Sequence, residues 1–255
     1  MQVVCLRVKG NFNSFRISSG IRYQRTYYIP TKTTLIGLLG SALGLDDKEL
    51  QNLFSSIKTN AILDSYSGIA NDLWLITKLK TRGKPESSPI IREMLFEPQY
   101  SIYYSIANSS TSATTYGHIT LDDIIDAFYD PVYPLSLGRS DEMIEVKELR
   151  KVNIHPALST PLPAPPSSAN QYFKNTILPF NFKEYFDKYE HTPLRKGYTF
   201  SLPQVMSIPI SFKIEDNGTR RPSKYMQVTM VYDKGVVISG REDSWLDEHR
   251  KFFLY

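Results

Sequence analysis

The sequence is poor in cysteine and in long apolar runs. Its single cysteine, Cys5, excludes an internal disulfide bond and a zinc site built from cysteines. Because Cys5 lies in an apolar, strand-like run, we expect a buried and unreactive thiol. The longest apolar stretch, residues 35–45, has about half of the roughly 20 residues that a membrane-spanning helix needs. Met1 leads into the strand-like run with no cationic leader, so we expect a soluble, cytoplasmic protein with no membrane partner.

Acidic residues are absent from the first 45 positions. The six bases of this segment leave 24 of the chain's 30 bases, and all 26 acidic residues, for the remainder. A basic segment on a near-neutral body indicates a local anionic partner. A solvated basic loop is the alternative, and it stays open, although aromatic residues are interleaved with the bases. These bases are Arg7, Lys9, Arg16, Arg22, Arg25 and Lys32.

Hydropathy patterns predict an α+β fold. Helical spacing of apolar residues predicts helices over 31–45, 46–57 and 120–131, with Thr31 and Thr120 as N-caps of the first and third. The glycines of the first helix predict close packing against a sheet. Alternation predicts strands over 2–10, 61–80 and 90–107, with a turn near Ala70 and Asn71. Residues 73–107 are therefore expected to form a long hairpin whose tip, 81–89, is basic.

The remaining segments complete the expected architecture. Residues 11–30 show no clear period and are predicted to be a long loop, and residues 132–146 carry a Gly-Arg-Ser loop into a strand. Asp-Asn-Gly at 216–218 predicts a hairpin turn, and residues 245–255 are expected to form a short helix or strand. This order favours a ferredoxin-like (modified RRM) core in residues 1–150. A proline-rich connection at 151–170 and a β-rich region at 171–255 would follow.

The stretch YYIPTKTTLIGLLGSALGL (27–45) raises the question of a phosphate site. It is not a Walker loop, because its glycines follow Lys32 instead of preceding it. It is not a dinucleotide fingerprint either, because no strand leads tightly into its glycines. A helix N-terminus nevertheless offers unpaired backbone N–H groups and the positive end of a dipole, which suits phosphate. An ordinary capped helix is the alternative.

The preceding loop favours the phosphate interpretation. Its arginines supply planar donors for phosphate, and its aromatic rings can stack on bases. This combination suits the backbone of a single-stranded nucleic acid better than a lone nucleotide. The aromatic residues are Phe15, Tyr23, Tyr27 and Tyr28.

These same residues carry a family resemblance. A basic, aromatic loop followed by PTKTTLIGLLGSALG (30–44) resembles the fifth family of CRISPR-associated (Cas) proteins, within the RAMP superfamily. REMLFEPQYSIYY (92–104) resembles a strand of that family's thumb hairpin, and DPVYPLSLGRSDE (130–142) resembles its Gly-Arg-Ser segment. The β-rich C-terminal region also fits, and the four features occur in the family's order.

The resemblance implies a role in type I CRISPR interference complexes (Cascade), in antiviral defence. Such a subunit caps the 5′ handle of the CRISPR RNA and contacts the large subunit and the first backbone (seventh-family) subunit. It meets target DNA only indirectly, through the complex, and no cofactor is expected. The residues that the resemblance assigns to RNA are Arg16, Arg22, Arg25, Tyr27, Tyr28, Lys32, Thr33, Arg92, Arg139 and Ser140.

The residues favour a non-catalytic subunit. One branch of the family, in type I-C systems, cuts repeat RNA without metal, which requires an acid and a base near the scissile bond. The four histidines, His118, His155, His191 and His249, lack a persuasive catalytic partner in the sequence, and His118 lacks the adjacent lysine of the cleaving branch. No metal site is expected, because Asp46-Asp47 and Asp122-Asp123 stand at helix starts. A metal-independent endoribonuclease and a protein-docking scaffold remain alternatives.

Overall fold

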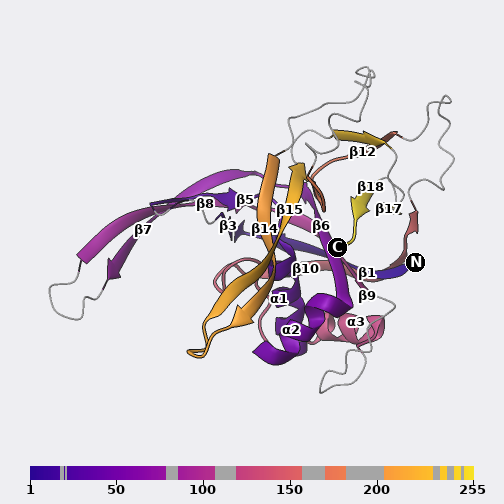
Figure 1. The fold of residues 1–255 in the computed structure, drawn as a ribbon, viewed down its shortest axis with the longest axis horizontal. Coiled ribbons are helices and arrows are strands. Elements are labelled where there is room, and N and C mark those ends of the chain that lie inside the picture. The colour runs from indigo at the N-terminus through magenta and orange to yellow at the C-terminus, as the bar shows by residue number, and fades with distance from the viewer. Residues whose placement is uncertain are drawn as a thin grey trace.

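The chain folds into an α+β structure built mostly of strands (Figure 1). The computed structural model describes residues 1–17, 20, 22–78, 86–106, 119–156, 170–181, 204–231, 236–239, 244–247 and 250–255. Its helices are α1 (Lys32–Leu43), α2 (Asp47–Ser56) and α3 (Leu121–Tyr129). Its strands are β1 (Gln2–Gly10), β2 (Phe12–Asn13), β3 (Phe15–Arg16), β4 (Tyr23–Gln24), β5 (Thr26–Tyr27), β6 (Ile57–Ser65), β7 (Gly68–Lys78), β8 (Glu86–Phe96), β9 (Gln99–Ile106), β10 (Ile144–Asn153), β11 (His155–Pro156), β12 (Asn170–Phe173), β13 (Thr176–Leu178), β14 (Gln204–Ile214), β15 (Arg220–Val231), β16 (Val236–Ser239), β17 (Ser244–Asp247) and β18 (Arg250–Phe253).

A seven-stranded sheet runs through the molecule in the order β10-β1-β9-β6-β13-β15-β14. Its neighbouring strands are antiparallel throughout. Along the chain, the first four of these strands and the helices follow the order β1-α1-α2-β6-β9-α3-β10. The sheet joins residues from the predicted regions 1–150 and 171–255, so both regions share one layer.

Strand β1 shows why both faces of this sheet are covered. Val4, Leu6 and Val8 point to one face and pack with the residues of α1 and α3. Val3 and Cys5 point to the other face and pack with Val152, Tyr103 and Phe252. Since side chains alternate along a strand, a nearly continuous apolar run is what two buried faces require.

The three predicted helices are confirmed, with different ends. Asp46 caps α2, and Thr120 caps α3 through a capping box with Asp123. Glycines in α1 have other uses than close packing on the sheet. A Cβ at Gly40 would lie 2.4 Å from a Leu50 methyl group of α2, and Gly44 ends α1 with a left-handed φ of 70°. No helix in the described ranges is long and apolar enough to cross a membrane.

The long hairpin lies earlier in the chain than 73–107. Strands β7 and β8 pair over residues 68–96 and project from the body (Figure 1), and we call this unit the thumb hairpin. The predicted turn at residues 70–71 falls inside β7. Glu97, with a φ of 48°, separates β8 from β9, which belongs to the main sheet. Apolar alternation continues across this break, so the sequence pattern predicts β8 and β9 as one continuous strand. The predicted basic tip lies mostly outside the described residues.

The C-terminal predictions are confirmed for the hairpin turn at 216–218, which joins β14 and β15. Strands β17 and β18 pair with each other, so the described part of the predicted segment 245–255 contains strand and no helix. This pair lies against the face of the main sheet opposite the helices, where the rings of Phe252 and Tyr103 stack at 4.1 Å. Residues 157–169 of the predicted proline-rich connection lie outside the described residues, whereas its first three residues belong to β10, so the main sheet extends past the predicted boundary at residue 150.

Candidate nucleic-acid interface

Residues 11–30 are organised into short strands, where the sequence predicted a loop. Strand β2 pairs with β8 near the base of the thumb hairpin, β3 pairs with β5, and β4 runs parallel to β8. Two-residue strands are too short to show a period in the sequence, which explains the incorrect prediction. The segment is therefore held against the thumb hairpin.

Buried side chains fix this segment in place. The Phe15 ring packs edge-on against Tyr100, with centroids 5.9 Å apart. The Thr26 hydroxyl accepts a hydrogen bond from the Phe15 N–H and donates one to the Tyr27 carbonyl, each at 2.7 Å. Glu93 of the thumb hairpin accepts a bond from the Thr26 N–H at 3.1 Å. These bonds hold the arginines of the segment next to the hairpin.

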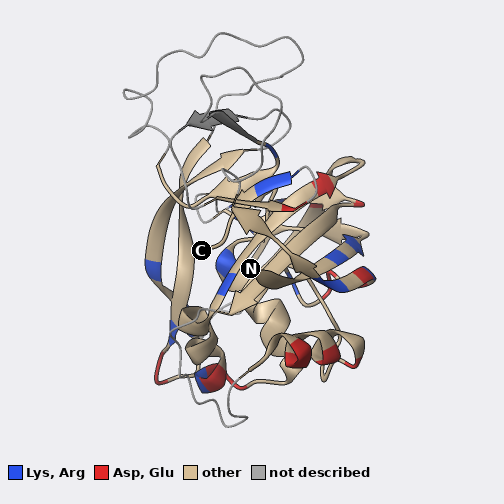
Figure 2. Cartoon of the chain, turned by 90° about the vertical axis from the view of Figure 1, so that its right-hand side faces the viewer, with Lys and Arg blue, Asp and Glu red and all other residues tan. Residues whose placement is uncertain are grey.

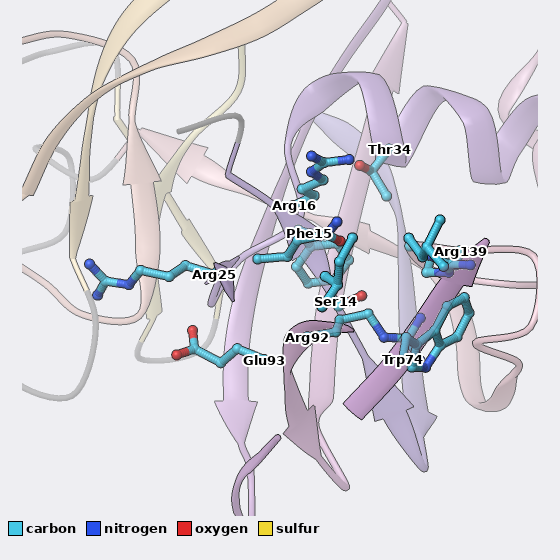
Figure 3. A pocket seen from close by; sticks show the side chains of 13 residues that line it. Ser14, Phe15, Arg16, Arg25, Thr34, Trp74, Arg92, Glu93 and Arg139 are labelled. Carbon is cyan, nitrogen blue, oxygen red and sulfur yellow. The ribbon is translucent and has the colours of Figure 1, made fainter. Parts of the chain in front are cut away.

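A cavity of about 400 Å³ lies against the middle of the thumb hairpin (Figure 3). Four elements line it: the β2–β5 segment, the thumb hairpin, the start of α1 and the Gly-Arg-Ser loop before β10. Four arginines face it, whereas Glu93 is its single acidic residue among those that the structure describes. We call it the arginine cavity. Its arginines are Arg16, Arg25, Arg92 and Arg139.

Two of these arginines contact the ring of Trp74 in β7. The guanidinium carbon of Arg92 lies 4.4 Å from the centre of the indole ring, and that of Arg139 lies 4.3 Å from it. Cation–π contacts of this kind stabilise charge that has been taken partly out of water. The indole N–H donates to Asp72, which also bonds Arg92 at 3.3 Å. Figure 3 shows Arg92 and Arg139 gathered at Trp74, while Arg16 extends toward Thr34.

Arg92 is almost fully buried, at 7% exposure. Its Nη1 lies 3.6 Å from a Glu142 carboxylate oxygen, and its Nη2 lies 3.3 Å from Asp72. Its Nε and Nη1 have no hydrogen-bond partner within the described part of the chain. Buried N–H groups without partners cost free energy, and the carboxylates of Asp72, Asp141 and Glu142, all within 4.0 Å of the guanidinium, offset that cost.

Glu142 anchors the Gly-Arg-Ser loop to the N-terminal segment. Its carboxylate accepts bonds from the Ser14 N–H at 2.7 Å, the Ser14 hydroxyl at 2.5 Å and the Arg139 N–H at 3.1 Å. Gly138 permits this approach. Its φ is 115°, and a Cβ there would lie 2.5 Å from the Ser14 carbonyl oxygen. The loop thereby sets the position of Arg139.

The start of α1 carries no side-chain cap within the described part of the chain. Thr31 occupies the N-cap position but makes no capping bond with its side chain to any described group; its hydroxyl lies 3.0 Å from the Thr33 hydroxyl. The first turn has no acidic residue, and Thr34 lines the arginine cavity. Burial, together with the nearby charge of Lys58, lowers the pKa of Lys32 to about 8.

The sequence matches one family model over most of its length. The model described as CRISPR-associated protein (Cas_Cas5) matches residues 3–197. The chain belongs to this Cas5 family. The family predicted from the sequence motifs is confirmed.

Two solved structures show the same fold. One, named "CRISPR RNA-guided surveillance complex", aligns with a TM-score of 0.52 and 17% identity over 93% of this chain and 90% of that chain. The other is a CRISPR protein from Archaeoglobus fulgidus, with a TM-score of 0.51 and 9% identity over 98% of each chain. At these identities the likeness concerns the fold alone. No curated protein matches the sequence.

The structure of this Cas5-family chain brings together part of the predicted RNA-binding set. Four of those residues, Arg16, Arg25, Arg92 and Arg139, line the arginine cavity. Thr33 lines an adjoining groove between α1 and the β14–β15 hairpin, and Lys32 begins α1. Five of these six residues therefore line one of two adjoining hollows, whereas Lys32 is buried and lines neither.

The other four predicted residues lie apart from the cavity lining. Tyr27 is buried in the core and cannot stack on a base without unfolding the segment. The Tyr28 ring is half-buried and meets Tyr66 edge-on at 5.7 Å. Arg22 is exposed, and its carbonyl accepts a bond from the Ile91 N–H at 2.8 Å. Ser140 is exposed beside Arg139.

Sequence reasoning missed Trp74, Ser14 and Glu142. Trp74 is one of two tryptophans, and it stands two residues after Asp72, which pairs directly with Arg92 across the hairpin. The pairing of Asp72 with Arg92 would have identified Trp74 as a neighbour of Arg92. This pairing depends on the register of β7 and β8, which the sequence does not reveal. Glu142 closes the Gly-Arg-Ser motif, which was noted without a role for this carboxylate.

The candidate catalytic and nucleophilic residues can be placed only in part. His155 is exposed in β11, whereas His118, His191 and His249 lie outside the described residues. Burial raises the pKa of the Cys5 thiol to about 11, in agreement with an unreactive cysteine. No group of three or more metal-ligating side chains occurs among the residues that the structure describes.

Proposed function

We propose that this chain is a non-catalytic RNA-binding subunit of a type I CRISPR effector complex and that it caps the 5′ handle of the CRISPR RNA. One observation carries the proposal: four arginines, Trp74 and the start of α1 line the arginine cavity against the thumb hairpin. The family and the fold support membership of a CRISPR complex. Its partners there would be the large subunit, the backbone subunit and, through them, target DNA.

The chemistry of the cavity suits unpaired RNA. Guanidinium groups bind phosphate oxygens through paired, charge-assisted hydrogen bonds. The indole and guanidinium planes accept the face of an unstacked base, and backbone N–H groups at the start of α1 favour negative charge. In such a subunit, sequence would be read by base pairing of the guide while the protein holds the end of the RNA.

We also infer that strands β10-β1-β9-β6 with α1 and α3 form the ferredoxin-like core that the sequence predicts. The chain order β-α-β-β-α-β and the sheet order four-one-three-two support this assignment. In this arrangement the arginine cavity lies beside the core, where the β2–β5 segment and the thumb hairpin meet.

The test compares two triple variants in an RNA-binding assay. Arg16→Ala/Arg25→Ala/Arg139→Ala removes three exposed bases of the cavity. Lys147→Ala/Lys213→Ala/Lys224→Ala removes the same charge from three exposed bases elsewhere. Affinity for labelled repeat RNA is measured by fluorescence anisotropy in EDTA at several salt concentrations. We leave Lys32 unchanged, because its burial would confuse binding with folding.

Each lost charge-assisted contact weakens binding by roughly tenfold, so the cavity variant should lose on the order of a hundredfold or more. The slope of log affinity against log salt concentration should become shallower by about two, which corresponds to about two fewer counterions released. The control variant should keep most of its affinity. Equal losses in the two variants, or unchanged binding in the cavity variant, would reject the proposed site.

A metal-independent endoribonuclease is the second candidate, and one observation favours it. Lys32 has a pKa near neutrality and starts the helix whose Thr34 lines the cavity. A lysine of this kind can exchange protons during RNA cleavage. The same EDTA reactions, run on a denaturing gel, separate the candidates: intact RNA supports capping. A discrete product would overturn the non-catalytic proposal.

A further inference from the structure

A second groove, of about 420 Å³, lies between the C-terminal end of α1 and α3. None of its lining residues belongs to the arginine cavity. Its floor is apolar and includes Leu43, Leu45 and Ala127. Asp123, Asp126 and Asp130 stand along it at helical spacing. We call it the acidic groove.

The charge of the acidic groove has one sign. Among the described residues, no lysine or arginine lines it, and Figure 2 shows acidic residues along α3. Both α1 and α3 end beside it, at Leu43 and Tyr129, and the C-terminal end of a helix carries partial negative charge. This potential repels phosphate, so RNA does not fit the groove, whereas lysine and arginine side chains do.

Exposed apolar side chains continue the groove along the segment after α3. Tyr129 is 71% exposed, Val132 is 62% exposed and Tyr133 is 56% exposed. The segment is firmly held, because the N–H groups of Val132 and Tyr133 bond carbonyl oxygens of Ala42 and Ser41 at 3.0 and 3.2 Å. Large apolar side chains grouped on a rigid surface are typical of a protein-binding site, and tyrosine is enriched in such sites.

We propose that the acidic groove binds a basic, amphipathic segment of a neighbouring protein subunit. Aliphatic side chains of that segment would cover the floor and the exposed tyrosines, while its lysines or arginines would pair with Asp126 and Asp130. The complementary charge is what selects this occupant over RNA and over an uncharged apolar peptide. The identity of the neighbour as a subunit of the same effector complex rests on the proposed function above.

Charge reversal in the groove tests the proposal. Asp126→Lys/Asp130→Lys changes two exposed carboxylates that have no bonded side-chain partner among the described residues. Glu145→Lys/Asp216→Lys is the matched control, with the same change of charge at exposed sites outside the groove. Each variant is co-expressed with the other subunits of its complex and the CRISPR RNA, and incorporation is measured by native mass spectrometry.

The groove variant should lose about tenfold or more in incorporation, and the control should assemble like the unmodified chain. Purified groove variant should bind repeat RNA within about threefold of the unmodified chain, because the arginine cavity is intact. If the unmodified chain does not bind repeat RNA, the proposed function is rejected. This outcome differs from normal assembly of the groove variant, so failure of the proposed function and failure of the docking proposal can be told apart. Normal assembly of the groove variant overturns the docking proposal.

A photo-crosslinking amino acid in place of Tyr129 identifies the occupant in the assembled complex. The proposal requires a crosslink to a peptide of another subunit that contains lysine or arginine among aliphatic residues. A crosslink to RNA, to a second copy of this chain or to an acidic peptide overturns it, as does the absence of any crosslink from an assembled complex.

Discussion

Replacing Glu142 by glutamine should destabilise the chain more than any change of equal size on its surface. Glu142 is 4% exposed and accepts three hydrogen bonds, two from Ser14 and one from the Arg139 N–H. It also lies 3.6 Å from buried Arg92. Glutamine keeps the size of the side chain and one acceptor oxygen, but it removes the negative charge and points N–H groups at other donors.

The size of the effect follows from these contacts. Breaking a buried ion pair by removing one partner costs about 3–5 kcal/mol. Asp72 remains 3.3 Å from Arg92 and offsets part of this cost, so we expect a loss of about 3 kcal/mol in the free energy of unfolding. In an Arg92→Met background the pair is already absent. The same Glu142→Gln change should then cost about 1 kcal/mol, which leaves a coupling of about 2 kcal/mol.

Urea unfolding followed by circular dichroism measures all four members of this double-mutant cycle. Glu145→Gln is the control, because its side chain is 66% exposed and its pairing with Lys147 should contribute less than about 1 kcal/mol. A loss below about 1 kcal/mol for Glu142→Gln, or equal losses in the two backgrounds, would refute the reasoning.

Two further predictions concern Gly138 and Lys32. Gly138→Ala should lower the free energy of unfolding by about 2–3 kcal/mol and weaken RNA binding, because its φ of 115° and the nearby Ser14 carbonyl leave no room for a Cβ. Gly37→Ala is the control, because the described structure places nothing within 4 Å of the new Cβ. This change should be neutral or stabilising in the same urea assay. The pKa of Lys32 is lowered to about 8 from 10.5 in the folded state, so the unfolded state binds more protons between these values and stability rises with pH across that window, by about 3 kcal/mol at most. Urea midpoints at pH 7 and pH 10.5 should show this rise, and Lys32→Met should remove its share; an identical pH dependence in the variant would show that the burial of Lys32 has no such effect.

Features that depend on local chemistry could be predicted from the sequence. Thr120 was correctly predicted as the N-cap of α3, and Asp-Asn-Gly correctly predicted the turn between β14 and β15. The start of α1 was also correct, although Thr31 does not cap it in the expected way. In each case the residues that decide the geometry lie within a few positions of one another, so their pattern is visible in one short window.

Features that depend on pairing between distant strands could not be predicted. The limits of the thumb hairpin were misplaced because apolar alternation continues from β8 into β9, and only Glu97 interrupts it. All four arginines of the arginine cavity were among the predicted residues, but Trp74 was not, because its contacts depend on where β7 meets the Gly-Arg-Ser loop. Tyr27 was misjudged for the opposite reason: a tyrosine in a basic segment looks exposed until its strand pairing buries it.

The chain itself fills the face of the main sheet opposite the helices. Phe252 stacks on Tyr103, and the Tyr103 hydroxyl donates to Asp247 at 2.7 Å. Arg250 of β18 donates a hydrogen bond from Nη1 to Asp64 of β6 at 2.9 Å, which holds the β17–β18 pair against the sheet. Residues 1–45, which carry bases and no acidic residue, supply two of the four arginines of the arginine cavity, Arg16 and Arg25, while the thumb hairpin and the Gly-Arg-Ser loop supply the other two.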